Sequence, residues 1–222
     1  MKRYLVVDIE TLPRPDAELD ALAPEFGGRG KTKDLEKIKA QIEEKKASFR
    51  DGAGLDAVTG SIALIGLKFD GEKPRVLRCD DAGEEAILRE FWNIIGNGTD
   101  YNVLVGFNCK GFDFPFLIRR SWMLGVHPAV RVLRPGDGRY WASNVVDLQE
   151  EWVMGDRLYV CRRDKLKISL DSMAKALGTK AQKTGDGSEF AELWATDKPK
   201  AIAYCADDCE VEAECYERLS LK

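Results

Sequence analysis

The sequence predicts an α/β protein in which a mixed sheet is flanked by helices. Segments with apolar residues at helical spacing alternate with short β-branched runs, which have the composition of buried strands. The order is three strands, then helix, strand, helix, strand and further helices, which is typical of the α/β class. The predicted strands span 4–9, 61–69, 74–79, 103–108 and 143–148.

The bulk composition indicates one soluble domain with room for an insertion. The chain has 222 residues, of which 44% are hydrophobic and 32% are charged. No stretch reaches the roughly 18 consecutive apolar residues of a membrane span. The apolar run after Arg3 meets Asp8 and Glu10 too soon for a signal peptide. We therefore expect one domain over residues 1–222, located in the cytoplasm and without a membrane partner.

The cysteines do not form a recognisable metal-binding or disulfide pattern. No CxxC pair occurs and His127 is the single histidine, so the sequence predicts no zinc site. A chain of this length needs no disulfide to be stable. Small buried hydrophobes are expected at Cys79, Cys109, Cys161, Cys205, Cys209 and Cys215.

The segment between the first two strands is predicted to be a charged insertion, about 13–52. Residues 13–30 are rich in Pro and Gly and indicate a loop, and residues 33–48 indicate a helix with a thin apolar stripe. Between Arg29 and Arg50 there are eight Lys/Arg and four Asp/Glu. A solvated charged helix is the simpler interpretation. An arm from Lys31 to Arg50 that contacts nucleic acid is the alternative.

Helices follow from periodicity and capping signals in the rest of the chain. Asp81 is expected to cap a helix over 84–95, and another helix opens near Pro115 after the fourth strand. A helix over 169–178 should end at Gly178. The last helix starts near Pro199 and runs to about Leu219.

The charges are distributed unevenly along the chain. The net charge is −4, but residues 119–167 hold ten Lys/Arg against six Asp/Glu. The stretch 207–214 is strongly acidic. Basic walls around an acidic centre suit an enzyme that holds phosphates through metal ions.

Two carboxylates stand at the end of the first predicted strand. Asp8 and Glu10 are one residue apart, so the period of two in a strand places both on one face of the sheet. Carboxylates on a buried strand are costly unless a cation or a donor meets them. Mg²⁺ and Mn²⁺ prefer such oxygen ligands. As a pair, the two residues indicate a functional site.

Three other candidates come from the fourth strand and the last helix. Asp113 follows the fourth strand, where it could also be a helix cap. Tyr204 and Asp208 are four residues apart, so they lie on one helix face. Taken alone, Tyr204 is more typical of a core residue.

Three motifs containing these residues occur in order along the chain. They read VVDIETL at 6–12, GFNCKGFDFPFL at 106–117 and YCADDCEVE at 204–212. Together they resemble the exonuclease motifs of the DEDD superfamily. The likeness is strongest to its tyrosine branch, which includes the proofreading exonuclease domain of family B DNA polymerases and stand-alone relatives. It extends from Tyr4 to Leu219, and the histidine branch would need a histidine at Ala203.

The resemblance implies a ribonuclease H-like fold, with helices on both faces of a five-stranded mixed sheet. It also implies a 3′→5′ exonuclease that releases nucleoside 5′-monophosphates from DNA with two Mg²⁺ or Mn²⁺ ions. Asp8 would bridge both ions, Glu10 and Asp208 would complete the first ion site, and Asp113 would hold the second ion. Tyr204 and Glu10 would orient the attacking water.

The resemblance also implies contacts with the substrate. Thr11 and Leu12 would lie near the terminal sugar and base, and Asn108 and Phe112 would lie near the strand. The expected partner is nucleic acid, as a single-stranded or frayed DNA 3′ end, together with a polymerase or repair protein.

Alternatives to this interpretation stay open. A 3′→5′ exoribonuclease of the same fold would carry the same motifs, because the 2′-hydroxyl is sensed outside them. A catalytically weak nucleic-acid-binding module is a further alternative, and the tyrosine motif argues against an endonuclease. Two more acids could be mistaken for ligands. Asp147 is more simply a helix cap, and Asp207 points about 100° away from Asp208 on an ideal helix.

Overall fold

The protein is built on one five-stranded mixed sheet. The computed structural model describes residues 3–28, 34–97, 101–134, 140–155, 168–185 and 187–219. The strand order is β3-β2-β1-β4-β5, in which β1, β2 and β3 are antiparallel neighbours and β4 and β5 run parallel to β1. The strands are β1 (Tyr4–Pro13), β2 (Gly60–Phe69), β3 (Arg75–Arg78), β4 (Val103–Gly106) and β5 (Val145–Asp147).

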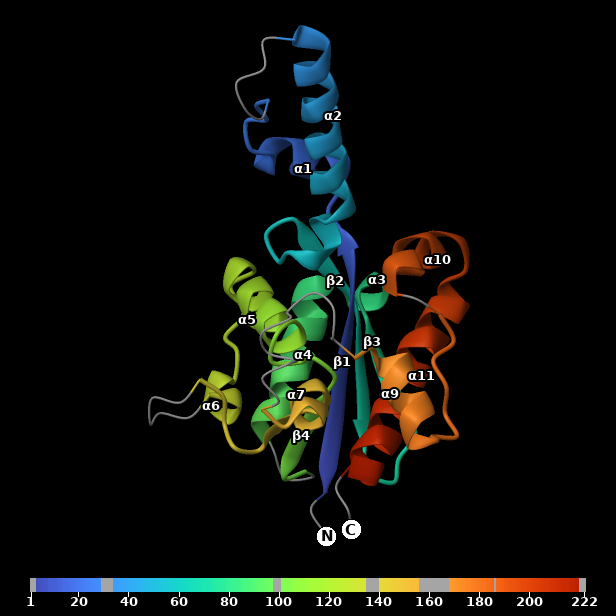
Figure 1. Ribbon diagram of the computed structural model, residues 1–222. Coiled ribbons are helices and arrows are strands. Elements are labelled where there is room, and N and C mark those ends of the chain that lie inside the picture. Colours follow the sequence, from blue (N-terminus) through green and yellow to red (C-terminus); the bar gives the residue numbers. More distant parts are fainter. Residues whose placement is uncertain are drawn as a thin grey trace.

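Alternate residues of β1 face two different layers of helices. Leu5, Val7 and Ile9 pack in the core formed with α4 (Glu84–Asn97) and α5 (Asp113–Met123). Tyr4 and Val6 pack in the core formed with α9 (Leu170–Leu177) and α11 (Lys198–Leu219). Figure 1 shows these two layers on opposite sides of the sheet. By the same alternation, Asp8 and Glu10 face the layer that contains α11.

The layers are completed by shorter elements. Besides the long helices, they are α3 (Cys79–Ala82), α6 (Val130–Leu133), α7 (Leu148–Val153), η2 (Gly187–Glu189) and α10 (Phe190–Thr196). No helix in the described ranges is both long and apolar enough to cross a membrane.

An arm, residues 14–52, stands out from the end of the sheet where β1 ends (Figure 1). It consists of α1 (Asp16–Leu22), a connection that includes Phe26, and α2 (Leu35–Asp51). The side chain of Asp34 caps α2, and no residue of α2 is buried. Edge-to-face packing of Phe26 and Phe49, with ring centroids 5.8 Å apart, joins the two sides of the arm.

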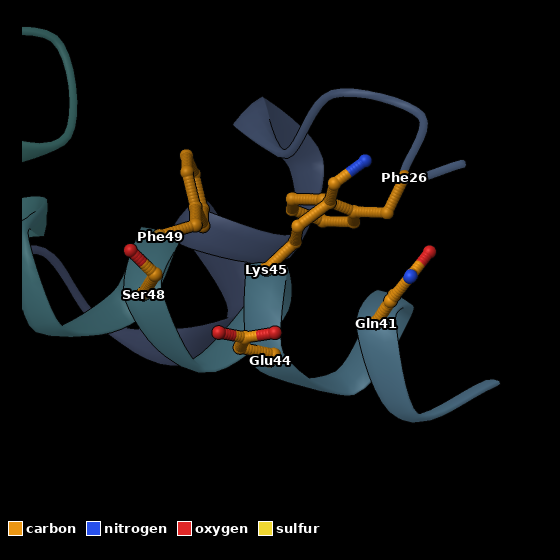
Figure 2. A pocket seen from close by; sticks show the side chains of 6 residues that line it. All are labelled: Phe26, Gln41, Glu44, Lys45, Ser48 and Phe49. Carbon is orange, nitrogen blue, oxygen red and sulfur yellow. The ribbon is translucent and has the colours of Figure 1, made fainter. Parts of the chain in front are cut away.

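The arm carries a hollow of about 410 Å³ next to this aromatic pair (Figure 2). The residues that line it are Phe26, Gln41, Glu44, Lys45, Ser48 and Phe49. None of the candidate site residues is among them. The hollow is therefore a feature of the arm and not of the candidate site.

The structure confirms most of the predicted elements and corrects some. The strand predicted to end at residue 9 continues to Pro13, and the predicted loop at 13–30 contains α1. Asp81 does not cap α4; it lies inside α3, and Gly83, with φ of 84°, separates the two helices. The predictions for Lys31 and Cys161 fall outside the described residues.

The two later helix ends are as predicted, and so are most cysteines. Gly178, with φ of 65°, ends α9, and α11 includes Pro199 and ends at Leu219. Cys79 is half-buried, and the remaining described cysteines are buried: Cys109, Cys205, Cys209 and Cys215.

Candidate active site

The central strand β1 supplies the first two carboxylates. β1 pairs with β2 on one side and with β4 on the other, so Asp8 and Glu10 lie in the middle of the sheet. Glu10 is only 8% exposed. The Asp8 Oδ2 atom is buried and has no hydrogen-bond partner among the described residues. A shift of register between Glu10 and Thr11 marks a bulge directly after the pair.

Asp113 joins this pair from the first turn of α5. Its side chain is buried, and its Oδ1 atom accepts a hydrogen bond of 3.1 Å from the backbone N–H of Ile9, between the two carboxylates of β1. The cap of α5 is Phe112, without a side-chain hydrogen bond. The alternative role of Asp113 as a helix cap is therefore not what the structure shows.

Helix α11 brings Tyr204 and Asp208 to the same place. Both residues are 3% exposed, on the face of α11 that covers β1 and β2. Asp208 Oδ1 is buried without a hydrogen-bond partner among the described residues. The neighbouring Asp207 instead accepts a hydrogen bond of 3.2 Å from the Thr184 hydroxyl. The helix therefore presents Asp208, and not Asp207, to the carboxylates of β1.

The acids influence one another's ionisation. Burial raises the pKa of Asp8, and the carboxylates of Glu212, Glu10 and Asp113 raise it further. Burial and the charge of Asp208 raise the pKa of Glu10 well above its usual value. Burial raises the pKa of Asp113 to about 7, although backbone hydrogen bonds oppose the shift. Such a cluster of acids is stable in ionised form only if cations are close.

Lys183 is a functional candidate that the sequence analysis missed. Its Nζ atom donates to Asp208 Oδ2 at 2.7 Å and lies 5.0 Å from the centre of the Tyr204 ring. Burial lowers the pKa of Lys183, but Asp208, Asp8 and Glu10 outweigh that effect and raise it. The residue lies in the connection between α9 and α10, far from any motif. No spacing in the sequence signals its position.

Glu212 is a second residue near the site that was not predicted from the sequence. It follows Asp208 by one turn of α11 and is 1% exposed, and its Oε2 atom has no partner among the described residues. Burial raises its pKa well above the usual value, and Cys209, Asp113 and Asp208 add to the shift, whereas a hydrogen bond from the backbone of Phe107 opposes it. The spacing of four from Asp208 is the signal that could have found it.

Asp147 has a structural role, as its simpler interpretation predicts. Its carboxylate accepts hydrogen bonds from the backbone N–H groups of Asn108, Lys110 and Gln149, at 2.9 to 3.0 Å. It thereby caps α7 and holds the turn that leads to Asp113. With this hydrogen-bond capacity already used, Asp147 is not a first choice as a metal ligand.

The four residues predicted to contact the substrate have different environments in the structure. The Thr11 hydroxyl donates to Gly54 O at 2.7 Å, which fixes the base of the arm to β1. Leu12 packs beside the core that contains Tyr204. Asn108 has a φ of 55°, in the left-handed region that asparagine tolerates. Phe112 is partly buried, and its ring lies 5.5 Å from that of Phe116.

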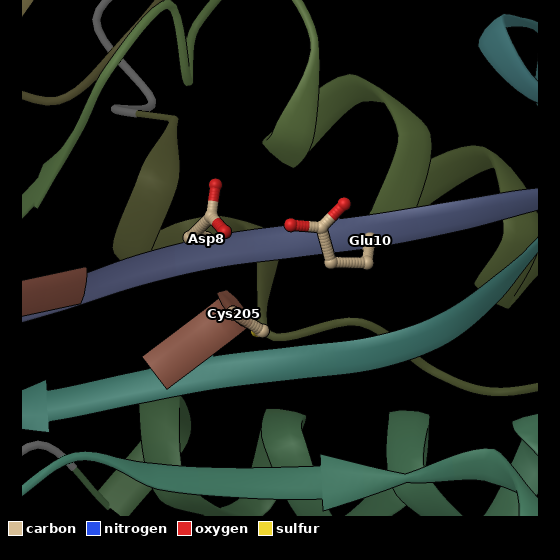
Figure 3. Close-up of side chains that lie close together, drawn as sticks. All are labelled: Asp8, Glu10 and Cys205. Carbon is tan, nitrogen blue, oxygen red and sulfur yellow. The ribbon is translucent and has the colours of Figure 1, made fainter. Parts of the chain in front are cut away.

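The donor set fits divalent cations. Four carboxylates converge from β1, α5 and α11, and buried oxygens of Asp8 and Asp208 lack partners among the described residues. Oxygen-rich sets of this kind are what Mg²⁺ and Mn²⁺ bind. One ligand atom each of Asp8, Glu10 and Cys205 lie within 4.8 Å of one another (Figure 3).

The chain is similar in sequence and in fold to parts of two DNA polymerases. Over 81 residues the chain is 32% identical to a protein named DNA polymerase 2 from Aeropyrum pernix, a match that covers 36% of this chain and 10% of that protein. The fold resembles the family B DNA polymerase from Pyrobaculum calidifontis, with a TM-score of 0.61 and 19% identity over 99% of this chain. The chain corresponds to 25% of that polymerase. The ribonuclease H-like fold is thereby confirmed.

A family model matches a large part of the chain directly. The matched residues are 57–211, which include Asp113, Tyr204 and Asp208, while Asp8 and Glu10 precede them. The sequence match and the fold agree with this assignment. The chain belongs to the family described as predicted 3′→5′ exonucleases related to the exonuclease domain of PolB.

Proposed function

We propose that the protein is a 3′→5′ exonuclease that hydrolyses the terminal phosphodiester of DNA and releases nucleoside 5′-monophosphates. The observation that carries the proposal is the convergence of Asp8, Glu10, Asp113 and Asp208 beside Tyr204, in a member of an exonuclease family. Two Mg²⁺ or Mn²⁺ ions at this site would supply a nucleophile at neutral pH and stabilise the leaving 3′ oxygen.

Each residue of the cluster has a distinct part in this proposal. Asp8 would contribute to holding both cations, Glu10 and Asp208 would complete one ion site, and Asp113 would hold the other. The hydrogen bond from the Ile9 N–H to Asp113 fixes the approach of α5 to β1, so Asp113 stays beside the two carboxylates of β1.

Tyr204 orients the attacking water in the proposed reaction. Burial raises the pKa of its phenol, and the charges of Glu10 and Asp208 raise it further, so the hydroxyl keeps its proton. A protonated phenol can donate one hydrogen bond and accept another. Together with Glu10, it can hold a water molecule in line with the last phosphodiester bond.

The proposed substrate is a single-stranded or frayed 3′ end. Glu10, Asp113 and Asp208 are buried and Asp8 is only partly exposed, so the last phosphate reaches them only if its nucleotide leaves its partner. Unpairing costs a few kcal/mol, least at a mismatched end. A mismatched terminus should therefore be degraded faster than a paired one. A polymerase or repair protein that delivers such ends is the proposed partner.

A ladder assay tests the proposal. DNA and RNA labelled at the 5′ end, with paired and mismatched 3′ ends, are incubated with the protein and Mg²⁺ or Mn²⁺. Stepwise shortening of the DNA that stops on addition of EDTA is expected. Shortening that survives complete chelation would falsify the metal-dependent mechanism. Faster degradation of RNA than of DNA would instead identify an exoribonuclease.

A further inference from the structure

The thiol of Cys205 lies in the carboxylate cluster, between Tyr204 and Asp208 on α11. It is fully buried. One ligand atom from each of Asp8, Glu10 and Cys205 lie within 4.8 Å of one another. Figure 3 shows Cys205 on α11 between β1, which carries both carboxylates, and the neighbouring strand β2. This group mixes a helix thiol with strand carboxylates, so no spacing of Cys and His residues in the sequence indicates it.

Gly66 of β2 explains how the thiol comes so close to the strand. Gly66 is the cross-strand partner of Asp8. A Cβ atom at Gly66 would lie 2.9 Å from Cys205 Sγ and 2.5 Å from Cys209 Sγ, which is too close for any side chain. The glycine therefore lets α11 pack tightly on β2. The two sulfur atoms occupy the space beside Asp8 that a side chain would otherwise fill.

The three ligand atoms are two carboxylate oxygens and one sulfur, and these two kinds of ligand prefer different cations. Carboxylates bind Mg²⁺ and Mn²⁺, whereas a thiolate selects Zn²⁺ and similar ions. Zinc holds sulfur at about 2.3 Å and oxygen at about 2.0–2.2 Å. Ligand atoms around one tetrahedral zinc ion are then about 3.5 Å apart. The ligand atoms of Asp8, Glu10 and Cys205 lie within 4.8 Å of one another, so each pair needs to come closer by at most about 1.3 Å to bind one ion. Three protein ligands leave the fourth position open for water.

We propose that Asp8, Glu10 and Cys205 form a binding site for a thiophilic divalent cation, represented by Zn²⁺. When the Zn–S bond forms, the thiol proton passes to solvent and the sulfur becomes a thiolate ligand. The buried Oδ2 atom of Asp8, which has no hydrogen-bond partner among the described residues, becomes a ligand as well. If the proposed function is correct, Zn²⁺ uses two carboxylates that the hydrolytic ions need, and it therefore competes with Mg²⁺ and Mn²⁺.

Cobalt is the probe for the thiolate, because sulfur bound to Co²⁺ gives a charge-transfer absorption in the near ultraviolet that oxygen ligands do not give. The full chain, freed of metal by chelation, is titrated with Co²⁺. The absorption should appear with the native chain and with Cys209→Ser, the matched control from the next turn of α11. Cys205→Ser should lose it, and Cys205→Ala replaces that variant if it does not fold.

Calorimetry gives a second measure of the site. Cys205→Ser should bind Zn²⁺ about 10–100-fold more weakly, or worse, since losing even an outer partner of a ligand has that effect. The affinity for Mn²⁺ should change much less, because its ligands are oxygens. Zn²⁺ should also inhibit Mn²⁺-supported cleavage by the native chain at lower concentrations than cleavage by Cys205→Ser. Equal inhibition of both would refute the competition.

Two outcomes would overturn the metal site itself. One is a folded, cobalt-bound native chain without the charge-transfer absorption. The other is an absorption that persists in Cys205→Ser and disappears in Cys209→Ser. The proposed function fails separately: a chain that shows the absorption but never shortens a DNA 3′ end keeps the thiolate site and is not a DNA exonuclease.

Discussion

At the scale of single residues, Tyr204 and Asp208 share a helix face but should differ in function. Asp208 carries a buried oxygen without a partner among the described residues and belongs to the carboxylate cluster. Tyr204 adds a hydroxyl that keeps its proton. The two residues therefore separate binding of the metal from orientation of the water.

Tyr204→Phe should leave fold and metal affinity intact and slow turnover. A positioned proton-transfer group contributes about 10²–10⁴-fold in rate, whereas Asp208→Asn should also weaken Mn²⁺ binding. Turnover, calorimetry and melting temperature of each variant are the measurements. Tyr101→Phe is the matched control, because its buried hydroxyl donates to Ile95 O at 2.6 Å, outside the candidate site. The expected loss of turnover in Tyr204→Phe is about 10²-fold or more. A loss of less than about threefold would mean that the hydroxyl is not catalytic.

Glu212 should be tolerated better as an amide than as a truncated side chain. Glu212→Gln keeps the acceptor for the Phe107 backbone and removes an acid whose pKa is raised by burial and by Cys209. Its melting temperature should equal or exceed that of the native chain near pH 8. Glu212→Ala leaves the Phe107 N–H without this acceptor, at a cost of about 1–3 kcal/mol. If both variants lose equal stability by denaturant titration, the ionised carboxylate is what the fold requires.

At the scale of elements, the lysines of α2 are occupied by local partners. Lys37, Lys39 and Lys46 form ion pairs with Asp34, Glu36 and Glu43. Lys45 donates to the backbone of Gly27. The positive charges of α2 are thus largely offset within the arm, which supports the solvated helix over a phosphate-binding surface.

Replacing all four of these lysines by glutamine should hardly change the salt dependence of DNA binding. Each phosphate contact contributes about 0.7–0.9 to the slope of log K against log salt. The slope should therefore change by less than the contribution of one phosphate contact. Fluorescence anisotropy at several salt concentrations measures the slope, and the affinity for Mn²⁺ is the control. A slope lower by two contacts or more would identify the arm as a DNA-binding element.

The elements also show what the sequence could predict. Alternation in β1 and the spacing of Tyr204 and Asp208 are local properties, so the sequence predicted that Asp8 and Glu10 share a sheet face and that Tyr204 and Asp208 share a helix face. Asp113 was a candidate through the resemblance of its motif. Lys183 was not visible, since a connection between helices delivers it from 25 residues before Asp208. Helix α1 was missed because Pro and Gly on either side of a short helix indicate a loop.

At the scale of the whole molecule, the metal-free protein carries buried acids that favour the protonated state. Burial raises the pKa of Asp113 from 3.8 to about 7. Because the folded-state pKa is above the unfolded value, this contribution to stability is complete below about pH 4 and is lost as pH rises through about 7. Asp8 and Glu10 shift in the same direction, since burial and neighbouring carboxylates raise the pKa of each.

The melting temperature of the metal-free protein should therefore fall between mildly acidic pH and pH 8, and Mn²⁺ should raise it more at pH 8. Calorimetric scans across this range, with and without Mn²⁺, provide the measurement. Asp113→Asn should flatten the profile, because it removes the group that titrates near 7. A profile that Asp113→Asn leaves unchanged would mean that Asp113 does not titrate in this range.

The pairing of Pro13 with Gly60 closes the β1–β2 ladder at the two ends of residues 14–59. The segment between Pro13 and Gly60 therefore begins and ends at the same point of the sheet, whatever its length. The entropic cost of closing such a loop grows only slowly with the number of residues in it. Evolution can thus lengthen, shorten or replace this connection by insertion and deletion without moving Asp8 or Glu10. We therefore expect homologues to differ in length mostly within this connection. The family match begins at residue 57, after the connection, and for that reason it leaves out Asp8 and Glu10.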